Sequence, residues 1–207
     1  HLPQATLAAV IMMAVVGLIN VKAIKHAWKA QRQDGIVAIV SFVLTLAFAP
    51  HLDKGILIGA GLALALFLYR TMQPRVAVLA RHPDGTLRDA EMFGLDTCKN
   101  ITMVRFDGSL YFANTSYFED KIQERVATKP ELKYVIVLAD GINEVDATGE
   151  EMLSHLSERL HAAGIEMFFA GVKKQVMDVF TRTGLYQHLG AERFFRTWYA
   201  PNNTVLA

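Results

Sequence analysis

Strongly apolar stretches fill most of the first third of the chain and are separated by short polar connections. There are three of them, at about residues 2–21, 35–50 and 55–71. A helix rises about 1.5 Å per residue, so the first stretch is long enough to cross a hydrocarbon core of about 30 Å. The other two are close to the shortest spanning length, and Pro50 and Gly55 mark a tight turn between them. The pattern predicts an all-α domain of three transmembrane helices over residues 1–73.

Basic residues indicate how these helices are oriented in the membrane. The first connection carries Lys22, Lys25, Lys29 and Arg32, and further arginines follow from residue 70 onward. Cytoplasmic loops are enriched in lysine and arginine, which places this connection and everything after residue 70 in the cytoplasm. The lysines have helical spacing, so the connection is either a short helix at the membrane interface or a solvated basic linker.

Small residues mark one side of the third apolar stretch. Gly55 and Gly59 have the GxxxG spacing that lets membrane helices approach closely, either within one protein or between two copies. None of the three stretches has an ionisable residue in its interior, and a transport path would normally need one. We therefore expect no substrate-binding residue in this chain.

The pattern changes at Pro74, where short apolar runs begin to alternate with helical periodicity. Strands are predicted at residues 76–80, 101–106, 109–113, 133–139, 165–170 and 194–198, and helices at 116–127, after Thr148 and at 172–183. Asp107-Gly108 predicts a hairpin turn, and Ser116 with Glu119 predicts a capping box. The alternation predicts an α/β domain over residues 74–207, with a mixed four- to six-stranded sheet and about three to four helices.

Charge and cysteine content exclude some functional classes. The 207 residues carry a formal net charge of +1, whereas nucleic-acid-binding proteins are usually clearly basic. Cys98 is the single cysteine, which excludes a disulfide framework and a cysteine metal cluster and suits a reducing compartment. The chain begins at His1 rather than at a methionine, so we expect it to be a piece of a longer protein.

Candidate chemistry concentrates in the stretch Tyr134–Gly149, a buried strand followed by a polar loop and a helix start. Asp140 and Asp146 flank the loop, either as metal-binding or acid–base carboxylates or as a turn residue and a helix cap. Thr148 is either the cap, paired with Glu151, or a phosphorylation target at a helix N-terminus. No nucleophile elbow, metal set or phosphate loop accompanies them, so we expect no enzyme activity, no metal and no cofactor.

Several motifs resemble one known family. The order of elements and Asp146-Ala-Thr-Gly149 resemble the STAS domain, and Phe106-Asp-Gly-Ser-Leu-Tyr-Phe-Ala-Asn114 is similar to the version carried by SulP anion transporters. The segments at residues 2–9, 55–59, 67–70 and 73–79 are similar to membrane helices and the linker of the same transporters. The resemblance implies the last three membrane helices, on the gate side of the membrane domain, followed by a cytoplasmic STAS domain.

What the resemblance implies about function is specific. The parent would be a secondary transporter of sulfate, bicarbonate, a dicarboxylate or a similar anion in the bacterial cytoplasmic membrane, with its substrate site in core helices that this chain lacks. The STAS domain would serve regulation, dimerisation or the docking of a cytoplasmic protein. Homodimer contacts would involve Gly55, Gly59 and the helix at 172–184.

The resemblance also bears on the loop. In anti-sigma factor antagonists, the other branch of the STAS family, the hydroxyl residue before this glycine is phosphorylated by a partner kinase, and here that residue is Thr148. Asp140, Asp146 and Gly149 complete the signature loop. The alternative hypothesis is therefore a membrane-tethered STAS signalling protein that is switched by phosphorylation of Thr148. An enzyme that uses Asp140 and Asp146 is a third, minor hypothesis.

Overall fold

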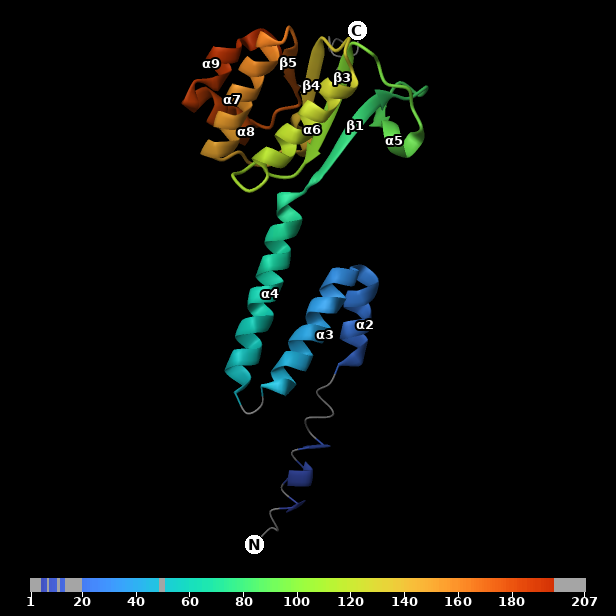
Figure 1. Ribbon diagram of the computed structural model, residues 1–207, viewed down its shortest axis with the longest axis vertical. Coiled ribbons are helices and arrows are strands. Elements are labelled where there is room, and N and C mark those ends of the chain that lie inside the picture. The colour runs from blue at the N-terminus through green and yellow to red at the C-terminus, as the bar shows by residue number, and fades with distance from the viewer. Residues whose placement is uncertain (1–4, 7, 11, 14–19, 49–50, 196–207) are drawn as a thin grey trace. The chain divides into compact units, whose positions relative to one another are not determined.

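The computed structural model describes residues 5–6, 8–10, 12–13, 20–48 and 51–195 (Figure 1). The chain forms two compact units, residues 1–69 and 70–207, and each is considered by itself. The helix predicted at residues 2–21 lies largely outside the described residues, and those described between 5 and 13 are helical.

From residue 20 onward, the described part of the first unit consists of three helices. They are α2 (Val21–Ala30), α3 (Arg32–Ala47) and α4 (Leu52–Met72), the last of which continues into the second unit. Within the described residues, the segment Asp53–Met72 is the one helix long and apolar enough to cross a membrane. The prediction that Gly55 marks the turn before this helix was wrong, because α4 has already begun at Leu52.

Gly55 and Gly59 lie where α4 approaches α3. A Cβ added at Gly55 would lie 2.6 Å from the Cα of Thr45, and one at Gly59 would lie 2.7 Å from the Oγ of Ser41. Such short separations leave room for glycine alone, so both residues serve packing within this chain. Many large apolar side chains of the two helices remain exposed, including Ile36, Ile39, Phe42, Val43, Leu46, Ile56, Leu57, Leu64 and Phe67. Exposed apolar surface of this extent is typical of helices covered by lipid or by further protein.

The second unit is built on a six-stranded mixed sheet with strand order β2-β1-β3-β4-β5-β6. The strands are β1 (Arg75–Arg81), β2 (Leu87–Asp89), β3 (Ile101–Asp107), β4 (Tyr134–Leu138), β5 (Glu166–Ala170) and β6 (Phe194–Phe195). β1 pairs antiparallel with β2 and β3, and β3 to β6 are mutually parallel. The predicted mixed α/β architecture is confirmed. The short β2 was not predicted, and of the edge strand expected at 194–198 the structure describes the first two residues.

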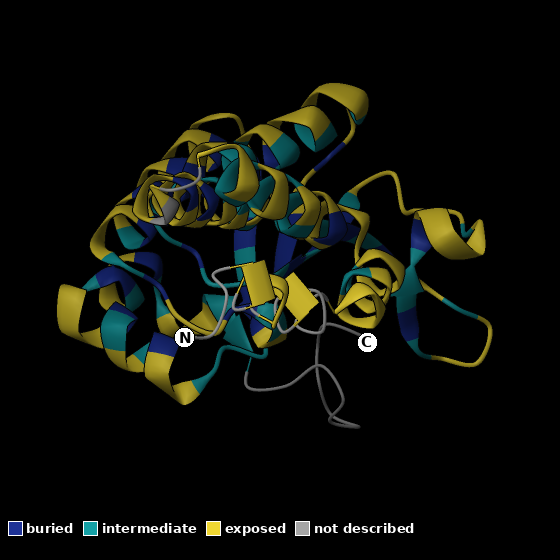
Figure 2. Ribbon diagram, turned by 90° about the horizontal axis from the view of Figure 1, so that it is seen from below, coloured by how far each residue is buried: buried dark blue, intermediate teal, exposed yellow. Residues whose placement is uncertain are grey.

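Helices cover the sheet and close the core. They are α5 (Ala90–Phe93), α6 (Thr115–Thr128), α7 (Ala147–Ala162), α8 (Lys174–Thr183) and α9 (Leu185–Leu189). The larger core cluster joins α6, α7 and α8 to one sheet face through fully buried side chains such as Phe118, Leu153, Phe180, Val137 and Phe169. A smaller cluster on the other face includes Leu79, Ile136 and Leu138. β4 therefore contributes to both clusters, and the strands hold much of the buried surface while the helices expose their outer sides (Figure 2).

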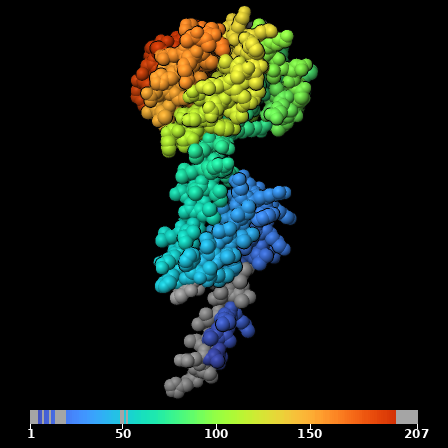
Figure 3. All heavy atoms as spheres, in the orientation of Figure 1, coloured from blue at the N-terminus to red at the C-terminus, as the bar shows by residue number. Residues whose placement is uncertain are grey.

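Two helix starts differ from the predictions. The capping box of Ser116 and Glu119 was wrong, because α6 begins one residue earlier, after Asn114. Glu119 instead accepts a hydrogen bond from Arg159 on α7 at 2.6 Å, and the two helices lie side by side (Figure 3). The helix expected at residues 172–183 begins at Lys174, and the short helix α9, which was not predicted, follows it.

Candidate functional site

Asp146 begins α7 at the end of the loop that follows β4. Its backbone is extended (φ −89°, ψ 178°), and its Oδ1 accepts a hydrogen bond from the backbone N–H of Gly149 at 2.7 Å. This is the geometry of an N-cap aspartate, which satisfies one of the open N–H groups of the first helical turn. The prediction that Thr148 caps the helix was therefore wrong, and the alternative in which Asp146 is the cap is confirmed.

The second carboxylate oxygen of Asp146 binds a distant part of the chain. Its Oδ2 accepts a hydrogen bond from the N–H of Phe112 at 2.9 Å. Two backbone hydrogen bonds reinforce the contact, from the N–H of Leu110 to the carbonyl of Glu144 at 2.8 Å and from the N–H of Asp146 to the carbonyl of Leu110 at 3.1 Å. The segment Ser109–Asn114, called the docked segment below, is thus held against the start of α7.

The docked segment is where the sequence predicted the strand at residues 109–113. That strand and the hairpin turn before it were wrong. Leu110 forms a single parallel bridge with Val145, outside any strand ladder. Leu110 and Phe112 would lie on the same face of a strand, yet Leu110 is fully buried and Phe112 is 69% exposed at the surface. The segment therefore lacks the burial pattern of a strand, and its hydrogen bonds go to the loop before α7.

Two glycines allow this close packing. A Cβ added at Gly149 would lie 2.7 Å from the carbonyl oxygen of Leu110. A Cβ added at Gly141 would collide with the carbonyl oxygen of Phe106 at the end of β3. Backbone occupies the position of a side chain in both places, so larger residues would push the docked segment or the end of β3 away.

Asn114 connects the docked segment to the end of α4. Its side chain is buried, with 1% of the residue exposed, and all of its hydrogen bonds are made with backbone. Its Oδ1 accepts from the N–H of Tyr111 at 3.0 Å, and its Nδ2 donates to the carbonyls of Ser109 at 2.9 Å and Thr71 at 3.1 Å. Thr71 is in the last turn of α4 and belongs to the same compact unit as the sheet. The docked segment therefore contacts the start of α7 on one side and the end of α4 on the other.

Sequence reasoning missed this role of Asn114. An asparagine directly before a helix is usually read as its N-cap, and Asn114 is indeed the residue before α6. However, its side chain makes no capping hydrogen bond to α6 and instead binds Ser109 and Tyr111, at the other end of the docked segment. The signal that was available is the polar residue at the end of the apolar run Leu110–Ala113.

Thr148 lies in the first turn of α7 with its side chain exposed. Among the described residues its hydroxyl has no hydrogen-bond partner, and Phe112, whose N–H binds Asp146, is also exposed. Glu150 is in the same turn. The hydroxyl is therefore accessible, at a helix N-terminus that favours negative charge but next to acidic side chains that oppose it.

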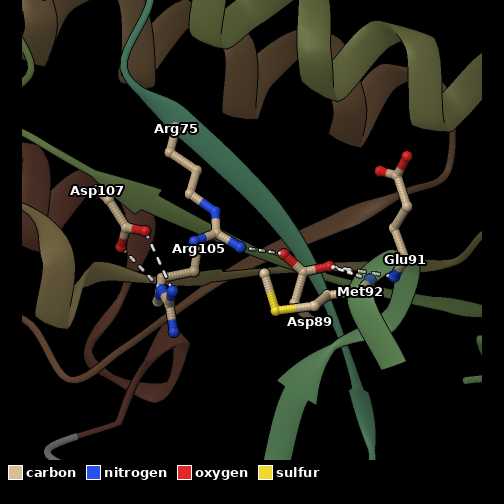
Figure 4. Close-up of polar contacts among 6 residues, drawn as sticks. All are labelled: Arg75, Asp89, Glu91, Met92, Arg105 and Asp107. Carbon is tan, nitrogen blue, oxygen red and sulfur yellow. Dashed lines mark hydrogen bonds and ion pairs between the residues drawn. The ribbon is translucent and has the colours of Figure 1, made fainter. Parts of the chain in front are cut away.

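Asp140 lies in a different electrostatic environment from Asp146. Arg105 forms two hydrogen bonds with Asp107, at 2.8 and 3.1 Å, beside the Arg75–Asp89 pair (Figure 4). These bonds, and more weakly the negative charge of Asp140, raise the pKa of Arg105 above its ordinary value. Asp140 is exposed, whereas both oxygens of Asp146 are occupied by backbone N–H groups. The structure does not bring the two aspartates into one acid–base or metal-binding set, and within the described residues no three His, Cys, Asp or Glu side chains gather as metal ligands.

Family models match most of the chain in two blocks. Residues 94–199 match the model described as STAS domain, and residues 1–41 match the model described as sulfate permease family. The two matches occur in the order that the sequence motifs predicted.

Curated relatives carry similar sequences along nearly the whole chain. The chain is 29% identical over 206 residues to the probable sulfate transporter 4.2 of Arabidopsis thaliana, covering 94% of this chain and 30% of the relative. It is 28% identical to the chloroplastic sulfate transporter 4.1 of the same plant, again covering 94% of this chain and 30% of the relative. The chain thus spans about 30% of the length of the curated relatives it matches.

Solved structures share the fold. The murine Slc26a9 anion transporter in the inward-facing state superposes with a TM-score of 0.71 at 20% identity, covering 84% of this chain and 28% of that one. A second structure of SLC26A9 gives a TM-score of 0.75 at 18% identity, covering 86% of this chain and 31% of that one. At these identities the similarity shows a shared arrangement of helices and sheet.

Proposed function

This chain belongs to the SulP family and carries a STAS domain, and we propose that the protein containing it is a secondary active transporter of small inorganic or organic anions. The observation that carries the proposal is the match to the sulfate permease and STAS models in one chain, along which plant sulfate transporters align over 94% of the residues. Sulfate is the first candidate substrate, followed by bicarbonate and dicarboxylates.

The anion site itself belongs to other helices of the transporter. The α3 and α4 helices carry no ionisable residue between Gly35 and Ala47 or between Gly55 and Tyr69. Anion sites in membrane transporters need positively polarised groups near the midplane, such as broken-helix termini or charged side chains. We assign residues 1–73 to the gate side of the membrane domain and residues 74–207 to the cytoplasmic STAS domain. The proposed location is the bacterial cytoplasmic membrane.

The STAS domain is proposed to regulate the transporter through the start of α7. Thr148 is the exposed hydroxyl at which a modification or a protein partner would act. Asp146 ties that surface to the docked segment, and Asn114 ties the docked segment to Thr71 at the end of α4. A change at Thr148 would thereby reach the last membrane helix through two adjacent contacts. This chain of contacts supports a regulatory role.

Assembly as a homodimer is part of the proposal. Gly55 and Gly59 were candidate dimer contacts, but both face α3 of the same chain. The helix α8 is the better candidate for a contact between two copies. The alternative of a membrane-tethered STAS signalling protein without transport is less favoured, because residues 1–41 match the permease family.

Uptake measurements on the complete transporter test the proposal. We expect uptake of radiolabelled sulfate, or of another anion in a panel with bicarbonate and dicarboxylates, by cells that produce the protein. Thr148→Glu should change the uptake rate, while Thr148→Ser should leave it unchanged and so serves as the matched control. Absence of uptake for every anion would overturn the transport proposal. Unchanged uptake with Thr148→Glu in a folded protein would overturn the regulatory role of this site.

A further inference from the structure

The helix α2 has a basic face and an apolar face. With about 100° between successive residues of a helix, Lys22, Lys25 and Lys29 fall within an arc of about 60°. Ile24 and Trp28 lie on another side of the same helix. Such a division is typical of helices that lie at the boundary between lipid headgroups and acyl chains.

The apolar face of α2 packs on α3. A Cβ added at Gly35, in the first turn of α3, would lie 2.6 Å from the Cε3 of Trp28, so the indole rests directly on the glycine. Ile24 and Ala27 are partly buried in the same helix pair, whereas Trp28 remains 45% exposed. The orientation of α2 around its axis is thereby fixed, with Trp28 near α3 and the lysines turned outward.

The basic face has no acidic partner within the described part of the chain. Lys22, Lys25 and Lys29 are exposed and take part in none of the ion pairs or side-chain hydrogen bonds of the described residues. Lys25 and Lys29 are four residues apart, a like-charge spacing that weakens an isolated helix. A helix of 10 residues is already marginal by itself, with Asn20 as its N-cap. An external anionic surface would relieve this repulsion.

Charge in the first unit is concentrated at this one place. Residues 1–69 contain five lysines and arginines, four of which lie between Lys22 and Arg32, and two acidic residues, Asp34 and Asp53. The four positive charges follow one apolar stretch and precede another. In a membrane protein this position is at the surface of the bilayer.

We propose that the basic face of α2 binds the headgroups of anionic phospholipids in the cytoplasmic leaflet, with Trp28 at the level of the membrane interface. The inference rests on the membrane location in the proposed function. It adds the class of lipid that the basic face of α2 binds. Each lysine near an anionic surface strengthens binding about fivefold, so the three together give an enrichment of about 100-fold.

Trp28 provides a direct probe, since the chain contains two tryptophans. The full chain carrying Trp198→Phe is reconstituted into phosphatidylcholine vesicles that contain a small fraction of either brominated phosphatidylcholine or brominated phosphatidylglycerol. Bromine quenches tryptophan at close range, so quenching reports which lipid lies beside Trp28. We expect brominated phosphatidylglycerol to quench at a much lower mole fraction than brominated phosphatidylcholine.

Two sets of variants make the test specific. The replacement of Lys22, Lys25 and Lys29 by Gln should reduce quenching by brominated phosphatidylglycerol to the level of brominated phosphatidylcholine. The control carries the same replacement at three exposed lysines of the second unit, namely Lys99, Lys133 and Lys174, and should keep the difference. Equal quenching by the two brominated lipids in the protein that keeps its three α2 lysines would overturn the inference. A difference between the two lipids that persists in the α2 variant would overturn it as well.

The outcomes also separate this inference from its premise. Absence of quenching by both lipids would place Trp28 outside the membrane and overturn the membrane location together with the inference. Quenching by brominated phosphatidylcholine without preference for phosphatidylglycerol overturns the lipid inference alone. Loss of the preference on addition of inorganic phosphate, but not of chloride at equal ionic strength, would show a site for free phosphate instead of lipid.

Discussion

Replacing Asn114 by alanine tests the connection between the STAS sheet and the end of α4. The change removes three hydrogen bonds, to Tyr111, Ser109 and Thr71, from a residue that is 1% exposed. A buried hydrogen bond contributes about 1 kcal/mol, and the N–H of Tyr111 would lose its acceptor. We expect a loss of about 3 kcal/mol in the free energy of unfolding, which corresponds to a decrease of roughly 10 °C in Tm for a domain of this size.

Hydrogen exchange locates the effect in the structure. In detergent micelles, Asn114→Ala should accelerate amide exchange in the docked segment, in residues 144–149 and in the last turn of α4. A purely local role would accelerate exchange in the docked segment alone. Asn143→Ala is the matched control, because this exposed asparagine lies in the loop before α7 and accepts its side-chain hydrogen bond from Lys173 at the surface; its loss should lower the free energy of unfolding by less than about 0.5 kcal/mol.

Asn114→Asp tests the amide oxygen and the amide nitrogen of this side chain separately. The aspartate keeps the acceptor for Tyr111 but places an oxygen against the carbonyls of Ser109 and Thr71, so repulsion and burial should raise its pKa in the folded state. A carboxyl whose pKa is raised on folding gains stability as the pH falls, since the protonated form donates one hydrogen bond. Unfolding of this variant should thus become harder between pH 7 and 5. A loss below 0.5 kcal/mol for Asn114→Ala, or a pH-independent Asn114→Asp, would refute the reasoning.

Two further predictions concern other parts of the STAS domain. Gly149→Ala should lower the free energy of unfolding by about 2 kcal/mol, because its Cβ would lie 2.7 Å from the carbonyl oxygen of Leu110; chemical denaturation checks this, and a neutral effect would contradict the close packing. The pKa of Asp89 is held below its ordinary value, first by the N–H of Met92 and then by Arg75, so its contribution is present above about pH 4 and is lost as the pH falls further. Asp89→Asn should therefore destabilise the domain at pH 7 and less so near pH 3, as measured by thermal melting; the same loss at both values would contradict the assignment.

The alternation of apolar runs and helical periodicity was sufficient to predict the α/β fold. β4 is the clearest case, because a strand buried on both faces needs apolar residues at every position, and the run from Val135 to Leu138 supplies them. The hydrogen-bond partners of a segment could not be predicted in the same way. Periodicity indicates which side of a segment is buried but not which backbone segment lies beside it. The docked segment shows this, because its apolar run predicts a strand while its hydrogen bonds go to the loop before α7.

Sequence analysis identified the correct loop for the candidate site, but the structure gives its residues different roles from those predicted. Sequence reasoning proposed either Asp146 or Thr148 as the cap, and two residues separated by one position cannot be distinguished by spacing alone. Their difference is set by the backbone, because Asp146 is extended and its two oxygens reach Gly149 and Phe112. The role of Asn114 depends on a contact with Thr71, which lies 43 positions away in sequence, and no local pattern encodes such a contact.

The geometry at Asp146 also determines what phosphorylation of Thr148, as proposed, would do. A phosphate at a helix N-terminus normally takes hydrogen bonds from the first backbone N–H groups. Here the N–H of Gly149 is already bound to Asp146, and the other oxygen of that aspartate holds the N–H of Phe112. A phosphate that competes for the first donor would also repel the carboxylate and so weaken the hold on the docked segment. The effect would then pass to Asn114 and the end of α4, so Thr148→Glu should accelerate amide exchange there, and Asn114→Ala should abolish this response.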